Sequence, residues 1–173
     1  YINFTHLLHL KFDIKEKKTS LKRNIKVMNK IIKICQQQKL FLIFPSTASF
    51  DFRKKKKISN NIKVINYYTK AKSECEKLII SANKNNYINS TILRIFNVYG
   101  DNYKNRYYIS KLIRSFKKAK KFEKINIKFS ENVRDYINTS DLNTLLLKVI
   151  KKKNNGIFEV GSGKSITIKD LSI

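Results

Sequence analysis

The sequence predicts an α/β fold built around a parallel β-sheet, and two observations predict it. Short, nearly continuous apolar runs of the kind that form buried strands recur along the chain. They alternate with segments in which apolar residues return every three to four positions, as they do on one face of a helix. Strands that alternate with helices form βαβ units, whose parallel sheet carries helices on both faces. The 173 residues suffice for one core of ordinary size but could not hold two full-sized domains.

The first half of the chain contains three predicted strands and two predicted helices. The strands are the apolar runs over 4–10, 40–44 and 91–96. Apolar residues with helical spacing predict amphipathic helices over 21–35 and 68–84.

The order of elements changes in the second half. The predicted elements are, in order, a helix over 108–118, short strands over 125–127 and 134–137, a helix over 142–150 and a strand over 157–160. Thr139 or Ser140 could cap the second of these helices, because both side chains can bond free amides of a first turn.

Charge is the most unusual feature of the composition, with 38 Lys and Arg against 12 Asp and Glu and a formal net charge of +26. Such an excess can indicate a nucleic-acid or anionic-membrane partner. The basic residues are mostly lysines, however, and their runs at 15–18, 54–57, 117–121 and 151–153 fall in separate polar stretches. Abundant Ile and Asn with only 4 Gly and 1 Pro suit an AT-rich coding bias. We therefore interpret the charge as solvated surface and do not expect a nucleic-acid partner.

The cysteines and the apolar runs indicate the compartment. Cys35 and Cys75 lie in amphipathic stretches without a CxxC pattern or a His at ligand spacing, so neither a metal site nor a disulfide framework is predicted. No apolar run approaches a membrane span, and no cleavable signal pattern opens the chain. We expect a reduced, cytoplasmic protein without a membrane partner.

Three polar residues stand at positions suited to catalysis. Thr47 follows the strand predicted over 40–44, and ligands of open α/β sheets bind at the carboxyl ends of strands. Tyr68 and Lys72 are four residues apart in a predicted helix and therefore share a helical face. A Lys ammonium beside a phenol favours the phenolate, so Tyr68 could act as a general acid or base. In a chain rich in Tyr and Lys, the pair alone better fits an exposed aromatic beside a solvated lysine.

Five segments, in order along the chain, resemble successive signatures of the NAD-dependent epimerase/dehydratase family. They are FLIFPSTAS at 41–49, YTKAKSECEKLI at 68–79, LRIFNVYGDN at 93–102, VRDYINTSDL at 133–142 and GIFEVGSGKSITIKDL at 156–171. Together they cover nearly the whole chain in the order that the family uses.

The resemblance implies a Rossmann-type fold, a doubly wound parallel sheet that binds NAD or NADP. Residues 1–97 would be the C-terminal portion of the NAD(P)-binding domain, and residues 98–173 a truncated substrate-binding part interleaved with the sheet. The family's GxxGxxG loop, which lets the backbone approach the cofactor pyrophosphate at a helix N-terminus, is absent from the sequence. We therefore expect a fragment of a longer enzyme that lacks the N-terminal strands.

The resemblance also implies roles for the three polar residues, since Thr47, Tyr68 and Lys72 match the family's catalytic Ser/Thr, Tyr and Lys. Tyr68 would be the acid/base, and Thr47 would orient the sugar hydroxyl. Lys72 would hold the nicotinamide ribose while tuning Tyr68. Asn24 resembles an Asn that lies near the family's cofactor, so Tyr68, Lys72 and Asn24 are the predicted cofactor-binding residues.

The implied substrate is a nucleotide-diphosphate sugar. Asn97 is similar to the Asn of the family's FNxxG motif and Arg134 to the Arg of its RD[FY]I motif, and both would face the diphosphate and the nucleotide. Arginine suits this task because its fork binds phosphate oxygens bidentately. Taken singly, Asn97 could be a turn residue ahead of Gly100 and Arg134 part of a surface ion pair.

The residues after Thr47 discriminate among the reactions of the family. The 4,6-dehydratases resemble one another in an Asp-Glu pair that eliminates water, whereas this chain has Ala48 and Ser49. The family's Val-Tyr-Gly is replaced by Phe-Asp-Phe at 50–52. We therefore predict a nucleotide-sugar epimerase or 4-ketoreductase rather than a dehydratase.

Two other readings stay open at this point: a non-catalytic, basic nucleic-acid-binding module, and a degenerate remnant of the fold. A homodimer is also open, because two helices of the family commonly pair between subunits. The segment GSGKS at 161–165 resembles the end of a nucleotide-binding P-loop. That pattern needs a Gly where Phe158 stands and a long helix where ITI favours a strand, so we interpret the segment as a tight turn.

Overall fold

The computed structural model describes residues 14–49, 67–100, 108–120, 124, 127 and 130–170. The chain divides into two compact units, the first comprising 1–95 and 148–159 and the second comprising 96–147 and 160–173. The second unit thus interrupts the first in sequence. The strand predicted over 4–10 lies outside the described residues, as does most of the strand predicted over 125–127.

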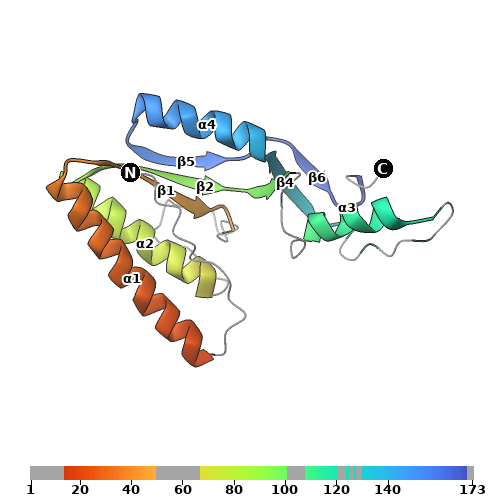
Figure 1. Cartoon of the computed structure of the whole chain (residues 1–173), viewed down its shortest axis with the longest axis horizontal. Helices are drawn as coiled ribbons and strands as arrows, with labels where there is room; N and C mark the ends of the chain where they lie inside the picture. Colours follow the sequence, from red (N-terminus) through yellow and green to blue (C-terminus); the bar gives the residue numbers. More distant parts are fainter. Residues whose placement is uncertain are drawn as a thin grey trace, which may run out of the picture. The chain divides into compact units, whose positions relative to one another are not determined.

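The first unit is a three-stranded sheet with two long helices on one face (Figure 1). Its elements are α1 (Ile14–Gln37), β1 (Phe41–Thr47), α2 (Tyr67–Lys84), β2 (Asn89–Ile95) and β5 (Gly156–Val160). The strand order is β1-β2-β5, and β1 and β2 are parallel along their whole length. These elements confirm the α/β prediction and the parallel sheet.

The hydrophobic core of this unit lies between the two helices and the sheet. Its buried side chains come from α1, β1, α2, β2 and the residue before β2: Met28, Cys35, Leu42, Phe44, Cys75, Ile79, Ala82, Ile88 and Ile92. Both cysteines are therefore buried, free thiols that pack as small apolar side chains. The apolar spacing that predicted the two helices is the spacing of these core residues.

Left-handed residues end both long helices. Lys39, with φ 51°, follows α1, and the amide of Leu40 donates to the carbonyl of Cys35 at 2.9 Å. Asn86, with φ 58°, ends α2 through the same pattern of bonds. These are Schellman caps, which satisfy carbonyls of the last turn and usually place Gly or Asn in the left-handed position.

β1 is longer than the sequence predicted, because it continues past Phe44 through Pro45 to Thr47. Among the described strands β1 is at the end of the order, and alternate amides of β1 face β2, as that of Ala48 does. Proline is tolerated at position 45 because the amide it lacks would face away from β2. Thr47 is consequently the last residue of the strand and not the first residue after it.

The second unit contains a small mixed sheet. Its elements are β3 (Asn97–Tyr99), α3 (Tyr108–Lys118), β4 (Val133–Asn138), β6 (Ser165–Thr167) and most of α4 (Thr139–Lys152). β4 is central, parallel to β3 and antiparallel to β6. The predicted helices over 108–118 and 142–150 are confirmed, whereas the three-residue strand β3 was not predicted.

The start of α4 corrects the predicted cap. Asn138 is the capping residue, because its Oδ1 accepts hydrogen bonds from the Ser140 amide at 2.9 Å and from the Ser140 hydroxyl at 3.0 Å. Thr139 and Ser140 belong to the helix itself. Among the described residues, the helices are all too short or too polar to cross a membrane.

Candidate active site

β1 holds Thr47 at the carboxyl end of the sheet, where the residue is 5% exposed. Its Oγ1 accepts a hydrogen bond from the Ser49 amide at 3.1 Å, which is the local bonding of a Ser/Thr turn. A hydroxyl has one proton and two lone pairs, so this bond uses only one acceptor position. The proton of the Thr47 hydroxyl can still be donated to a substrate oxygen.

α2 carries Tyr68 and Lys72 one turn apart, with Tyr68 half-buried and Lys72 only 6% exposed. The Nζ of Lys72 donates to the carbonyl oxygen of Pro45 at 2.5 Å and lies 4.8 Å from the centroid of the Phe44 ring. Lys72 therefore reaches from α2 to β1, two residues before Thr47. The alternative of a solvated lysine does not describe this side chain.

Burial changes the acid–base properties of this part of α2. It lowers the pKa of the Lys72 ammonium from its ordinary 10.5 to about 8, although Cys75 and Glu76 oppose the shift. Lys72 thus carries its proton at neutral pH and loses it in mildly alkaline solution. Burial raises the pKa of the Cys75 thiol to about 11, so this thiol stays protonated and unreactive.

Ser46 is a functional candidate that the sequence reasoning missed. Its side chain is buried, and among the described residues its Oγ has no hydrogen-bond partner. Buried hydroxyls are normally bonded, so this group suits a polar ligand that reaches the end of β1. The ribose hydroxyls and the amide of a nicotinamide cofactor have that chemistry, and the Lys72 ammonium bonds to Pro45, the preceding residue of the same strand. The residues present therefore fit the nicotinamide and ribose side of such a cofactor.

Asn24 lies on α1 in the same unit and is half-buried. Its backbone carbonyl accepts a weak hydrogen bond from the Cys75 Sγ at 4.0 Å, which ties α1 to α2. The contact with a cofactor that the resemblance implies for Asn24 stays a prediction.

Asn97 and Arg134 lie on neighbouring strands of the second unit. Asn97 is exposed and begins β3, and its Nδ2 donates to the backbone carbonyl of Asp135 at 3.0 Å. The Asn97 side chain therefore joins the two strands and is not a turn residue. Arg134 is exposed, and its Nη1 donates to the carbonyl of Val133 at 2.8 Å. Among the described residues Arg134 forms no ion pair with a carboxylate, so the alternative of a surface ion pair does not describe it there.

Asp135 explains the segment that resembles a P-loop. Its Oδ1 accepts from the Ser162 amide at 2.7 Å and from the Ser162 hydroxyl at 2.9 Å, and its Oδ2 accepts from the Gly163 amide at 2.9 Å. Gly163 has φ 77°, and a Cβ added at Gly161 would lie 2.5 Å from Oδ2. The turn therefore wraps closely around a carboxylate of its own chain. Its amides, which would hold a phosphate in a P-loop, already bind an anion.

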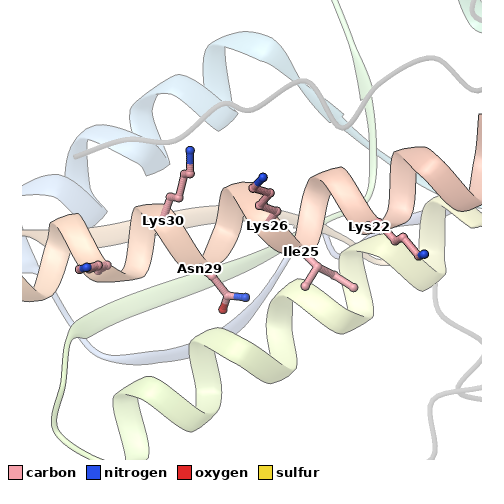
Figure 2. Close-up of a pocket in the computed structure, with 6 residues that line it drawn as sticks. Lys22, Ile25, Lys26, Asn29 and Lys30 are labelled. Atoms are coloured by element: carbon pink, nitrogen blue, oxygen red, sulfur yellow. The ribbon is translucent and has the colours of Figure 1, made fainter.

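A shallow groove runs along α1 and is lined by residues of that helix alone (Figure 2). They are Lys22, Ile25, Lys26, Asn29, Lys30 and Lys33. No predicted catalytic or cofactor residue is among them. An open helix face with four like charges lacks the enclosure of a small-molecule site, so the groove is not the active site.

Comparison with known proteins agrees with the fold. The chain is similar to ADP-L-glycero-D-manno-heptose-6-epimerase from Brachyspira hyodysenteriae, at 29% identity over 168 residues, which is 90% of this chain and 52% of that protein. The structure resembles UDP-N-acetylglucosamine 4-epimerase from Methanobrevibacter ruminantium with a TM-score of 0.77, at 23% identity and over 92% of this chain and 53% of that one.

A third relative was solved with its ligands. UDP-glucuronic acid 4-epimerase from Bacillus cereus, in complex with UDP-glucuronic acid and NAD, matches with a TM-score of 0.69 at 25% identity, over 86% of this chain and 48% of that one. The chain spans about half the length of these relatives. Residues 2–161 match the NAD dependent epimerase/dehydratase family, and the chain therefore belongs to that family.

Proposed function

We propose that the complete protein containing this chain is an NAD(P)-dependent nucleotide-sugar epimerase or 4-ketoreductase with Thr47, Tyr68 and Lys72 as its catalytic residues. One observation carries the proposal. A lysine that is almost fully buried and still protonated at neutral pH is held against β1 through the carbonyl of Pro45, two residues before Thr47, and it lies one helical turn after Tyr68. Burying a lone ammonium is costly, so a site retains one where its charge is used.

In this proposal the Tyr68 phenol moves the proton of the reacting sugar hydroxyl. The Lys72 ammonium, one helical turn away, favours the phenolate by its positive charge and stays charged up to a pH of about 8. The Thr47 hydroxyl donates to the same sugar oxygen and orients it. When bound, the nicotinamide cofactor supplies hydride acceptance and return at a sugar carbon. Lys72, Asn24 and Ser46 are the residues that would hold its ribose and nicotinamide.

The substrate is proposed to be a nucleotide-diphosphate sugar. Arg134 is exposed, and no carboxylate of the described residues pairs with its guanidinium, which suits bidentate binding of phosphate oxygens. Asn97, one strand away, can donate the second N–H of its amide to a phosphate oxygen, because only one of its two N–H groups is bonded to β4. Residues 98–173 would then form the substrate-binding part, and residues 1–97 the cofactor-binding part, of a cytoplasmic enzyme.

Product analysis tests the proposed activity. The complete protein is incubated with UDP- and ADP-linked sugars, and the products are separated by ion-exchange chromatography. An epimerase gives a stereoisomer without consuming reduced cofactor, whereas a ketoreductase consumes one reduced cofactor for each product. Thr47→Val should lower kcat roughly 10- to 100-fold, because it removes the donor to the sugar oxygen but keeps the side-chain volume. Conversion of no nucleotide sugar under either condition would refute the proposal.

The lysine face of α1 favours a second candidate function, nucleic-acid binding. Lys22, Lys26, Lys30 and Lys33 line one groove, and residues 21–37 contain no acidic side chain. Such a stripe could contact phosphates without reading bases.

Fluorescence polarisation with a labelled 20-base-pair duplex and a labelled single strand separates this candidate from the enzyme. Four phosphate contacts would weaken binding about 100-fold between 50 and 200 mM salt. Replacing the four groove lysines with Gln should abolish that binding, while the same change at Lys148, Lys151, Lys152 and Lys153 serves as the matched control. No binding at 50 mM salt would eliminate the candidate.

A further inference from the structure

Glu76 and Arg94 form a buried ion pair beside the proposed site. Glu76 is 1% exposed and lies on α2, one turn after Lys72. Arg94 lies on β2, and its Nη2 donates to the Glu76 Oε2 at 2.6 Å while its Nε donates to both carboxylate oxygens at 3.2 Å. The Arg94 side chain is 14% exposed, so solvent screens the pair only weakly.

This ion pair and the Lys72 hydrogen bond anchor the same stretch of α2 to adjacent positions of the sheet. Lys72 bonds to Pro45 on β1, and Glu76 bonds to Arg94 on β2. Arg94 is paired in register with Ser46, the residue that follows Pro45. One turn of α2 is therefore bonded to the sheet at two places near the end of β1, and these places differ by one residue in the strand register.

We propose that Glu76 and Arg94 are positioning residues that hold Lys72 at the end of β1 for the reaction proposed above, on which this inference rests. Glu76 acts by its charge as well as by its bond, because it is the carboxylate that favours the protonated form of Lys72. In the part of the chain that the structure describes, the other groups that contact or charge-couple to the Lys72 ammonium are the Cys75 thiol, the Phe44 ring and the Pro45 carbonyl, none of which carries a negative charge at neutral pH.

A role in stability alone does not explain the pair. Replacing a buried ion pair by apolar side chains of similar volume is often neutral or stabilising, because desolvation of the two ions offsets their attraction. A double variant of that kind therefore keeps the fold while it removes the carboxylate beside Lys72.

The titration of Lys72 tests the inference in the complete protein, without substrate and without turnover. Lysine is labelled with ¹³C at Cε, and the Lys72 resonance is identified by its loss in Lys72→Met. Glu76→Gln and the double variant Glu76→Met with Arg94→Leu should both move the Lys72 midpoint below its starting value of about 8. The expected displacement is on the order of half a pH unit to one pH unit. In the active enzyme, the alkaline limb of kcat/KM should move in the same direction.

The exposed pair on the same helix provides the control. Glu74 accepts from Lys77 at 2.8 Å, and the two side chains are 33% and 60% exposed. Glu74→Gln should leave the Lys72 midpoint unchanged. A folded double variant with an unchanged Lys72 midpoint would overturn the inference, and so would an equal displacement in Glu74→Gln.

The result is separable from the proposed function. If the Lys72 midpoint moves but the wild-type protein converts no nucleotide sugar, the pair positions Lys72 and the proposed reaction is wrong. If the protein is active and the midpoint does not move, the reaction stands and the pair has no positioning role.

Discussion

Replacing Lys72 by Met should make the protein more stable at neutral pH. Burial lowers the pKa of Lys72 from 10.5 to about 8, so the folded state holds the proton less tightly than the unfolded chain by about 3 kcal/mol, at about 1.4 kcal/mol per pH unit. Met fills a similar volume without a charge, but it leaves the Pro45 carbonyl without its hydrogen bond, which costs about 1 kcal/mol. The expected gain in the free energy of unfolding at pH 7 is therefore about 2 kcal/mol.

The stability difference between Lys72→Met and the wild type should depend on pH. Below a pH of about 8 both states of the wild-type protein are protonated, and the folded state bears the whole cost of the buried charge. Between about 8 and 10.5 the folded state has lost the proton and the unfolded state keeps it, so wild-type stability rises with pH. The advantage of Lys72→Met should shrink over this range by about 1.4 kcal/mol per pH unit.

Urea unfolding of the complete protein at pH values from 7 to 10 measures both effects. Lys77→Met is the matched control, because Lys77 lies on the same helix with a side chain that is 60% exposed. It should change stability by less than about 0.5 kcal/mol at every pH. A Lys72→Met protein that is less stable than the wild type at pH 7, or whose advantage is constant across pH, would refute the argument that the ammonium is buried at a cost.

Two further predictions concern the supporting structure. Lys39→Gly should raise the free energy of unfolding by about 0.5–1 kcal/mol, because Lys39 follows α1 with φ 51°, a conformation that favours glycine. Lys30→Gly, within the same helix, should lower it by about 1 kcal/mol. Urea unfolding measures both changes, and changes of the same sign in the two variants would contradict the cap. Asp135→Ala should speed hydrogen exchange of the Gly163 amide at least 10-fold by removing its acceptor, as mass spectrometry of peptides over 160–165 would detect, while Asp141→Ala on exposed α4 should not.

The sequence predicted the elements whose formation depends on local spacing. The 3.6-residue rhythm of Met28, Cys35, Cys75 and Ile79 marks both long helices, and these residues form the core. Short or irregular features were missed because their stability comes from partners elsewhere. β3 has only three residues and exists through its pairing with β4, and β1 passes through Pro45, which locally argues against a strand.

In the candidate site, too, local features could be predicted from the sequence and contacts between distant residues could not. A strand end and a four-residue spacing, both of which are local, marked Thr47, Tyr68 and Lys72 as candidates, and the resemblance to the family implied their roles. The contacts that give Lys72 its properties join residues distant in sequence, since 27 positions separate it from Pro45. The same holds for Asp135, which no local pattern connects to the turn at 161–164, 27 positions away. The sequence analysis considered only consecutive basic residues. It therefore did not recognise that the lysines at 22, 26 and 30, spaced by about one helical turn, share one face of α1.

The central claim is that Tyr68 is the acid/base of a nucleotide-sugar reaction, and one measurement tests it most directly. The kcat of Tyr68→Phe and the affinity of this variant for the nicotinamide cofactor are compared with those of the complete wild-type protein, with Tyr67→Phe on the same helix as the control. The account predicts that Tyr68→Phe loses at least about 100-fold in kcat and keeps its cofactor affinity, while Tyr67→Phe retains turnover. Unchanged turnover in Tyr68→Phe would contradict it.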